Sequence, residues 1–311
     1  MTAQGVVRRK LEMAASLGEL VTTMKGFASV RVHQYRRTMR ALDASTRTLD
    51  LAARALLHLH PELAGAQPGA EASSITVVFG SDRGLCGAFN DRMARFAAQD
   101  LALAPVEGMT VRVVAVGRRV ARRLRSAGRP SDAMLSAPSS LEAVDAAVAE
   151  LLDFIDAERR AGHDSRLRLV YARPVGSTRF EPRTVQVLPL DLGWLHQLKD
   201  LPWVTRKLPM ELSDPRELLR GLIRQRVALA IVEAFGSSLA AENAARLAAM
   251  DAASHNVDER LARLRARSQA ARQAAVTAEL LDIQSAAAAL EDEDESAEDA
   301  DPVGPDPAKD A

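Results

Sequence analysis

The placement of proline is the feature of this sequence that most constrains its fold. All fourteen prolines fall into two groups, eleven from Pro61 to Pro215 and three from Pro302 onward. Proline disrupts helix interiors, so the long stretches without it are free to form uninterrupted helices. We therefore divide the chain into an N-terminal helical arm over residues 1–60, a middle domain over 61–213, a C-terminal helical arm over 214–290 and a tail over 291–311.

Both arms carry apolar and small residues at steps of three and four, which is the period of a helix with one buried stripe. Two such stripes can be buried only against each other or against a partner. We therefore predict that the arms pack antiparallel as a coiled coil, with Asp214 capping the second helix. The stripes comprise Val7, Leu11, Ala14, Leu17, Val21, Met24 and Ala28 in the first arm, and Leu219, Ile223, Val227, Ile231, Phe235 and Leu239 in the second.

The middle segment alternates between short apolar runs and amphipathic runs. This alternation predicts an α/β domain with a largely parallel sheet. The expected strands cover residues 75–79, 111–116, 167–172 and 184–190, and the expected helices begin near 91 and cover 120–127 and 141–160.

The charge distribution is uneven although the formal net charge is zero. Residues 291–311 contain ten acidic residues and one lysine, a net charge of −9, so the rest of the chain carries +9. A basic body favours an acidic partner, and the acidic, proline-containing tail is typical of a disordered segment. The longest apolar run is interrupted by Glu233, so we expect no direct span of a membrane.

One loop has the composition of a binding or catalytic site. The segment VFGSDRGLCGAFND at 78–91 carries glycines at 80, 84 and 87 and the only cysteine, Cys86. This glycine spacing fits neither of the common phosphate-binding motifs, and Asp82 would place a carboxylate where a phosphate lies. Cys86 lacks the sequence signature of a nucleophile, so we interpret it as a small buried residue.

The remaining candidate sites are also weak. The six histidines show no metal-ligand spacing, so we expect no metal and no cofactor. The arginines of VGRRVARRLRSAGR at 116–129 could form an anion or nucleic-acid surface, but without interleaved aromatic residues we favour a solvated helix face and no nucleic-acid partner. A mechanical or scaffolding role therefore fits the sequence better than catalysis.

Three motifs, in order along the chain, identify a family. The segment SDRGLCGAFN at 81–90 resembles the SDRGLCGGLN motif of the gamma subunit of F-type ATP synthases. The segments SSLAAENAARLAAMDAASHN at 237–256 and ARQAAVTAELLDIQSAAAAL at 271–290 resemble the C-terminal helix of that subunit. The resemblance covers about residues 5–290. It departs from the family pattern at 19–31 and at 203–212, which suggests a divergent or alternate-type bacterial member.

The resemblance implies a long antiparallel coiled coil joined to a Rossmann-like α/β domain. It also implies a non-catalytic central shaft whose rotation, driven by an ion current through the c ring, is coupled to ATP synthesis or hydrolysis. The implied partners are the alpha and beta subunits, the epsilon subunit and the c ring. The implied location is peripheral, on the cytoplasmic face of the bacterial inner membrane. A coiled-coil adaptor without a rotary role and a nucleotide-dependent α/β enzyme are the alternatives.

The resemblance also assigns roles to individual residues. The family's coupling positions fall on both arms, its contacts to the beta subunit fall on basic residues near the N-terminus, and its signature loop falls at 81–87. The coupling positions are Met24, Glu242, Arg246, Gln273, Thr277 and Glu279; the basic contacts are Arg8, Arg9 and Lys10; and the signature loop is Ser81, Asp82, Arg83, Gly84, Leu85, Cys86 and Gly87.

Overall fold

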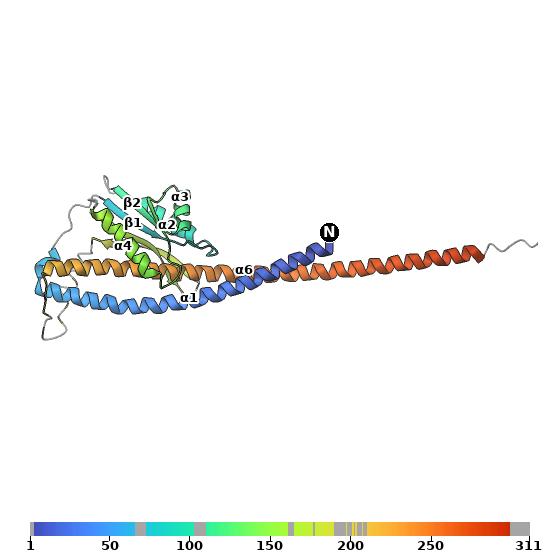
Figure 1. The fold of residues 1–311 in the computed structure, drawn as a ribbon, viewed down its shortest axis with the longest axis horizontal. Coiled ribbons are helices and arrows are strands. Elements are labelled where there is room, and N and C mark those ends of the chain that lie inside the picture. The colour runs from blue at the N-terminus through green and yellow to red at the C-terminus, as the bar shows by residue number, and fades with distance from the viewer. Residues whose placement is uncertain are drawn as a thin grey trace, which may run out of the picture. The chain divides into compact units, whose positions relative to one another are not determined.

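A computed structural model describes residues 3–65, 73–102, 110–160, 165–176, 178–189, 197, 201, 203, 207 and 210–298 of the chain (Figure 1). The described residues fall into two compact units, one of residues 21–253 and one of residues 1–20 with 254–311. The elements are α1 (Ala3–Leu59), η1 (Pro61–Gly65), β1 (Ser73–Phe79), α2 (Phe89–Ala102), β2 (Thr110–Val116), α3 (Arg118–Ser126), β3 (Ala133–Leu135), α4 (Val144–Arg160), β4 (Ser165–Val175), β5 (Arg179–Leu188) and α6 (Pro215–Glu298).

The larger unit contains a five-stranded sheet in the order β3-β2-β1-β4-β5. The pairs β1–β2, β1–β4 and β2–β3 are parallel, which confirms the predicted α/β domain, while β5 is antiparallel to β4. The connection between β4 and β5 is too short to hold a crossover helix, so the two strands pair antiparallel. The chain turns at Gly176, whose φ of 64° suits glycine. Sequence periodicity missed the three-residue β3 and placed the start of β5 at Thr184 instead of Arg179.

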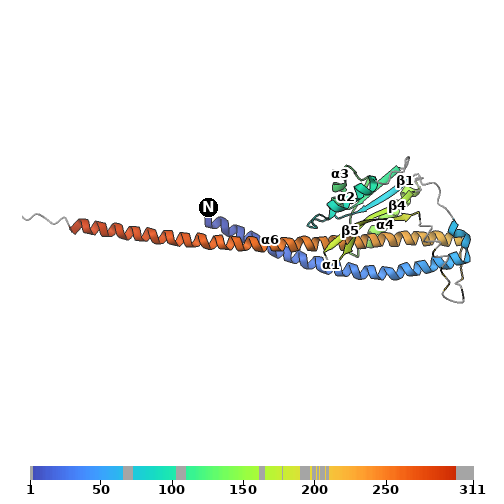
Figure 2. The same ribbon diagram turned by 180° about the vertical axis from the view of Figure 1, so that it is seen from behind.

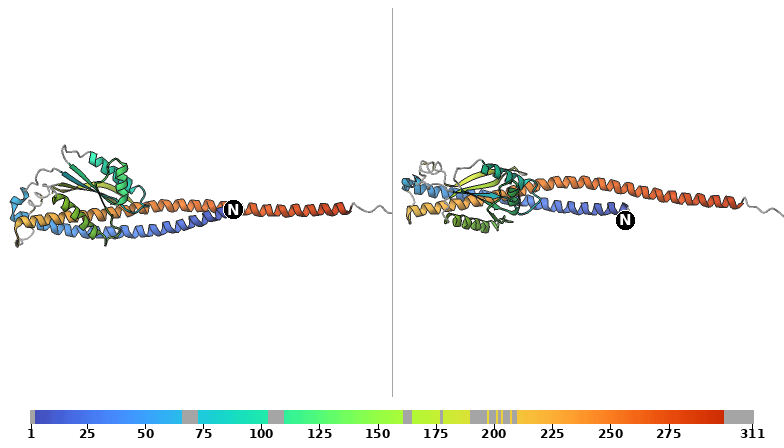
Figure 3. Two further views of the ribbon diagram at one scale, coloured as in Figure 1. Left: turned by 45° about the horizontal axis from the view of Figure 1, so that its top comes forward. Right: turned by 90° about the horizontal axis from the view of Figure 1, so that it is seen from above.

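Each face of the sheet buries a separate apolar core, because successive strand residues point to opposite faces. Ile75, Val77 and Phe79 of β1 point into a core shared with α4 and α6, and Val78 points into a core shared with α2 and α3. Figure 3 shows these helices on the two sides of the sheet. The ring of Phe79 meets that of Phe235 of α6 edge to face at 4.9 Å, so the sheet is fastened directly to the C-terminal arm.

Within the larger unit, α1 and α6 lie side by side and antiparallel (Figures 1 and 2). Lys25 pairs with Asp251, and Asp50 pairs with Arg226 at 3.1 Å, so residue numbers rise along one helix as they fall along the other. The predicted coiled coil is thereby confirmed. Gly236 permits a close approach of the helices, because a Cβ atom at this position would overlap the end of the flexible Met39 side chain.

Helix α6 begins with the predicted cap. The Asp214 carboxylate accepts hydrogen bonds from the backbone N–H groups of Arg216 at 2.9 Å and Glu217 at 3.1 Å, as predicted for an N-cap.

Further along α6, every residue from 234 to 246 is buried. Burial on all sides of a helix requires cover beyond one coiled-coil partner, and here α1, the sheet and the loop after β1 provide it.

The smaller unit contains residues 3–20 of α1 and residues 254–298 of α6. Val257 and Leu264 of α6 are buried, whereas residues 272–285 of α6 are exposed. The helix continues past the predicted boundary at Leu290 to Glu298, and the rest of the predicted tail, 299–311, lies outside the described residues. Among the described residues one helix, within 215–285, is long and apolar enough to cross a membrane, but 72% of its most apolar stretch is buried inside the protein.

Candidate coupling site

The signature loop, residues 81–87, turns sharply between β1 and α2. The backbone reaches positive φ at Leu85, 62°, and at Gly87, 54°. A left-handed conformation costs glycine little but strains other residues, so the glycine at position 87 has a clear conformational reason. The turn exposes the Leu85 side chain at 55% and directs the carbonyl of Gly84 toward α6.

Polar side chains fix the two ends of this loop to each other. The Asn90 amide accepts a hydrogen bond from the Ser81 N–H at 3.0 Å and donates one to Ser81 Oγ at 2.8 Å. The Ser81 hydroxyl then donates to the carbonyl of Arg83 at 3.0 Å. Cys86 is buried beneath these groups, 3% exposed, which confirms its interpretation as a small packed residue. Burial raises the pKa of its thiol, against the opposing effect of the Ser81 hydrogen bond, so the reactive thiolate is disfavoured.

The Asp82 carboxylate occupies the N-terminal end of helix α3. Its oxygens accept hydrogen bonds from the backbone N–H of Arg118 at 2.7 Å and of Ala137 at 3.1 Å. The local N-cap residue, Gly117, has no side chain to do this. A helix N-terminus near a parallel strand end is where phosphate binds in many nucleotide-binding folds, and here the chain fills it with its own carboxylate.

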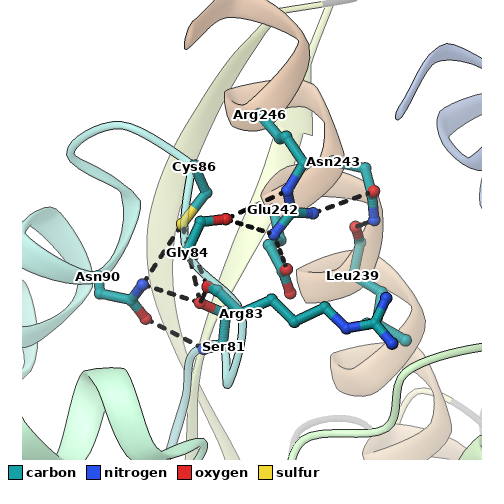
Figure 4. A network of polar contacts seen from close by, with 9 residues as sticks. All are labelled: Ser81, Arg83, Gly84, Cys86, Asn90, Leu239, Glu242, Asn243 and Arg246. Carbon is teal, nitrogen blue, oxygen red and sulfur yellow. Dashed lines mark hydrogen bonds and ion pairs between the residues drawn. The ribbon is translucent and has the colours of Figure 1, made fainter. Parts of the chain in front are cut away.

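The loop is tied to α6 by Arg246, which also pairs with Glu242 (Figure 4). Arg246 donates to the carbonyl of Gly84 through Nη2 at 3.1 Å and through Nε at 3.3 Å. The same Nη2 donates to Glu242 Oε1 at 2.6 Å, and Nη1 donates to Asn243 Oδ1 at 3.2 Å. Both charged side chains are only 8% exposed, so the guanidinium is held inside the protein by three partners.

The electrostatics of this pair follow from its burial. Desolvation raises the pKa of Glu242, while the adjacent Arg246 opposes that shift. Arg246, and after it Arg83 and Arg31, favour the charged form of this carboxylate. The family resemblance predicts that these two residues take part in coupling. In this chain Arg246 contacts the signature loop, and Glu242 contacts Arg246.

The other predicted coupling residues lie on the helices. Met24 is half-buried on α1, and Gln273, Thr277 and Glu279 are exposed on α6. The Thr277 hydroxyl donates to the carbonyl of Gln273 at 2.9 Å, one helical turn earlier. Each of these three polar side chains is accessible to a partner.

The predicted basic contacts are likewise exposed. Arg9 and Lys10 face solvent, and Arg8 pairs with Glu12 at 3.1 Å with both side chains well exposed. On α3, the arginines form a solvated face as predicted, with Arg123 paired to Asp91 at 3.0 Å. Among the described residues, acidic, histidine and cysteine side chains form no cluster suited to a metal ion.

Asn243 belongs to this network, and the sequence analysis did not single it out. It orients Arg246 and donates to the carbonyl of Leu239 at 2.8 Å while only 3% exposed. Its spacing of three residues before Arg246 was the available signal, because positions i and i+3 share a helix face.

Comparisons with known proteins agree with the resemblance found in the sequence. The model of the ATP synthase family matches residues 4–290. The ATP synthase gamma chain of Granulibacter bethesdensis is 30% identical, with 93% of this chain and 100% of the relative aligned. That of Thermosynechococcus vestitus is 31% identical, with 70% of this chain and 75% of the relative aligned.

Solved structures share the fold at lower identity. A chain of the Euglena gracilis mitochondrial ATP synthase, from a structure of OSCP, F1 and c-ring in rotational state 3, superposes with a TM-score of 0.60 at 19% identity over 99% of both chains. A chain of the Tetrahymena thermophila mitochondrial ATP synthase central stalk and c-ring superposes with a TM-score of 0.53 at 20% identity, over 76% of this chain and 99% of the other.

Proposed function

Because the chain belongs to the ATP synthase gamma chain family, and is thus a non-catalytic rotor subunit of the central stalk, we propose that it couples rotation of a c ring to ATP synthesis or hydrolysis on a hexamer of alpha and beta subunits. Its partners are then alpha, beta, epsilon and the c ring. Its site of action is a membrane-associated F1 complex, on the cytoplasmic face of the inner membrane if the source is a bacterium.

The observation that carries this proposal is the exposed surface of α6 at residues 272–285. Val276, Leu280 and Ile283 are 50–61% exposed there at helical spacing. Polar coupling candidates Gln273 and Thr277 lie on the same segment. Exposed apolar residues that recur at helical spacing call for a partner that covers them. An apolar, mostly uncharged helix suits a rotor, because it can turn inside a surrounding ring of subunits without binding strongly at any one angle.

Coupling through such a rotor is reciprocal: the angle of the rotor changes the affinity of each catalytic site, and occupancy of that site changes the favoured angle by the same free energy. The shaft stabilises a different conformation of each catalytic site only if its surface differs from side to side. Acidic loops on the stator are the expected partners of the exposed cations Arg8, Arg9 and Lys10 near the start of α1.

Assembly and coupling test the proposal separately. The full chain, coexpressed with alpha, beta and epsilon from the same source, should copurify in a complex that hydrolyses ATP. Vesicles carrying the whole synthase should pump ions when given ATP. Replacing Gln273, Thr277 and Glu279 together by alanine should reduce pumping more than hydrolysis, whereas Gln269→Ala, at an exposed site on the same helix, should leave both unchanged.

One result would count against the rotor role, and another against the assignment of the coupling residues. If the chain copurifies with an unrelated protein and not with beta, an adaptor role replaces it. If the triple variant and Gln269→Ala behave alike in pumping, the assignment of the three coupling residues is wrong while the rotor role stands.

A further inference from the structure

A small cavity of about 200 Å³ lies beside the signature loop. Arg31 and Tyr35 of α1 line it together with Arg83 of the loop, Arg118 of α3 and Ser139. These residues come from four separate parts of the larger unit. A ligand in the cavity would therefore contact α1, the loop and the start of α3 at once.

The charges around the cavity are only partly compensated. Arg118 pairs with Asp82, and Glu242 pairs with Arg246. Arg31 and Arg83 make no hydrogen bond or ion pair with the residues that the structure describes, although the charge of Glu242 acts on both, and Figure 4 shows the Arg83 guanidinium without a contact to the other residues drawn. Among the residues that line the cavity, the basic ones exceed the acidic ones by one: Arg31, Arg83 and Arg118 against Asp82 and Glu242.

Tyr35 supplies a third polar group to the cavity. Its side chain lines the cavity, and its hydroxyl makes no hydrogen bond with the residues that the structure describes. A ligand with an acceptor oxygen would accept a hydrogen bond from this hydroxyl.

We propose that this cavity binds a small tetrahedral oxyanion of the phosphate class, with Arg31 and Arg83 as its principal donors and the Tyr35 hydroxyl as a further donor. The planar guanidinium presents paired N–H groups that match the oxygens of such an anion. The cavity is smaller than the roughly 300–1,000 Å³ of sites for drug-sized ligands, so it suits inorganic phosphate better than a nucleotide. The bound anion fastens α1 to the signature loop.

Inorganic phosphate and the full-length chain test this inference without any other subunit. Because a ligand that binds only the folded state stabilises it, phosphate should raise the thermal unfolding temperature above that in chloride of equal ionic strength. Calorimetry should give a binding constant that weakens at least tenfold in Arg31→Gln and in Arg83→Gln. Arg122→Gln, which removes an exposed arginine from α3, is the matched control and should bind phosphate like the unmodified chain.

Three outcomes would overturn the inference. Phosphate could stabilise the chain no more than chloride does. It could stabilise the variant lacking both Arg31 and Arg83 as much as the unmodified chain, which would mean general salt binding. ADP could bind in preference to phosphate with the same dependence on both arginines, which would contradict the size argument.

Discussion

Replacing Arg246 with methionine should strongly destabilise the larger unit. The substitution leaves the Glu242 carboxylate, 8% exposed, without its ion-pair partner, and it removes both donors to the Gly84 carbonyl. Leaving one member of a buried pair uncompensated costs about 3–5 kcal/mol. For a cooperative unit of this size, that loss corresponds to a fall of roughly 6 to 20 °C in unfolding temperature.

A second substitution and a change of pH separate the charge effect from lost packing. The double variant Arg246→Met with Glu242→Leu removes the stranded charge, so it should be more stable than Arg246→Met alone by about 2 kcal/mol. In Arg246→Met, burial raises the pKa of Glu242 further, because only the charges of Arg83 and Arg31 remain to oppose it. The folded state then binds a proton more tightly than the unfolded state does, so the loss of stability should shrink as the pH falls.

The assay is urea unfolding of the full-length chain followed by circular dichroism at several pH values. Arg263→Met is the matched control, because Arg263 pairs with Glu259 at the same spacing of four residues but with side chains 74% and 64% exposed. Surface pairs contribute about 0–1 kcal/mol, so the control should change little. Equal losses in Arg246→Met and Arg263→Met, or a loss in Arg246→Met that does not depend on pH, would refute the reasoning.

Three further predictions follow from local geometry. Gly80→Ala should cost about 1–3 kcal/mol in urea unfolding because its Cβ would overlap a buried valine of α3, whereas Gly221→Ala, in open space on α6, should add about 0.5–1 kcal/mol. Asp82→Asn should cost about 1–2 kcal/mol in the same assay by weakening the α3 cap, and no loss would contradict that role. Hydrogen bonding to Glu211 raises the pKa of His60, so its stabilising contribution is complete below the unfolded pKa and is lost as pH rises through the folded one; an NMR titration of His60 should show the raised value, which Glu211→Gln should lower.

The long helices could be predicted from sequence because their signal is local. A stripe at steps of three and four, with proline only at the ends, specifies a helix without knowledge of its partner. The strands buried on both faces, such as β1, were equally clear as continuous apolar runs. Strand β5 was not, since its first residues, Arg179 to Arg183, include three charged residues and a proline and resemble a loop. Their pairing with β4 depends on the hairpin at Gly176.

Sequence patterns could predict only part of the candidate site. The pairing of Glu242 with Arg246 follows from their spacing of four residues on a helix. The third partner, the Gly84 carbonyl, lies 162 residues away in sequence, so no local pattern could indicate it. Burial was hidden for the same reason: a helix segment with Glu, Asn and Arg has the composition of a solvated surface, and only the folded sheet and loop cover it.

The burial of Arg246 changes how this residue can take part in coupling. A guanidinium with three internal partners has little capacity left for a stator side chain, and pulling it away would expose a buried carboxylate. Leu85 and Arg83 of the signature loop, in contrast, are exposed, and the loop that carries them is fastened to α6 through Gly84. A force on the loop is therefore transmitted to α6 through Arg246. In this chain, Arg246 positions the signature loop on α6 through the carbonyl of Gly84.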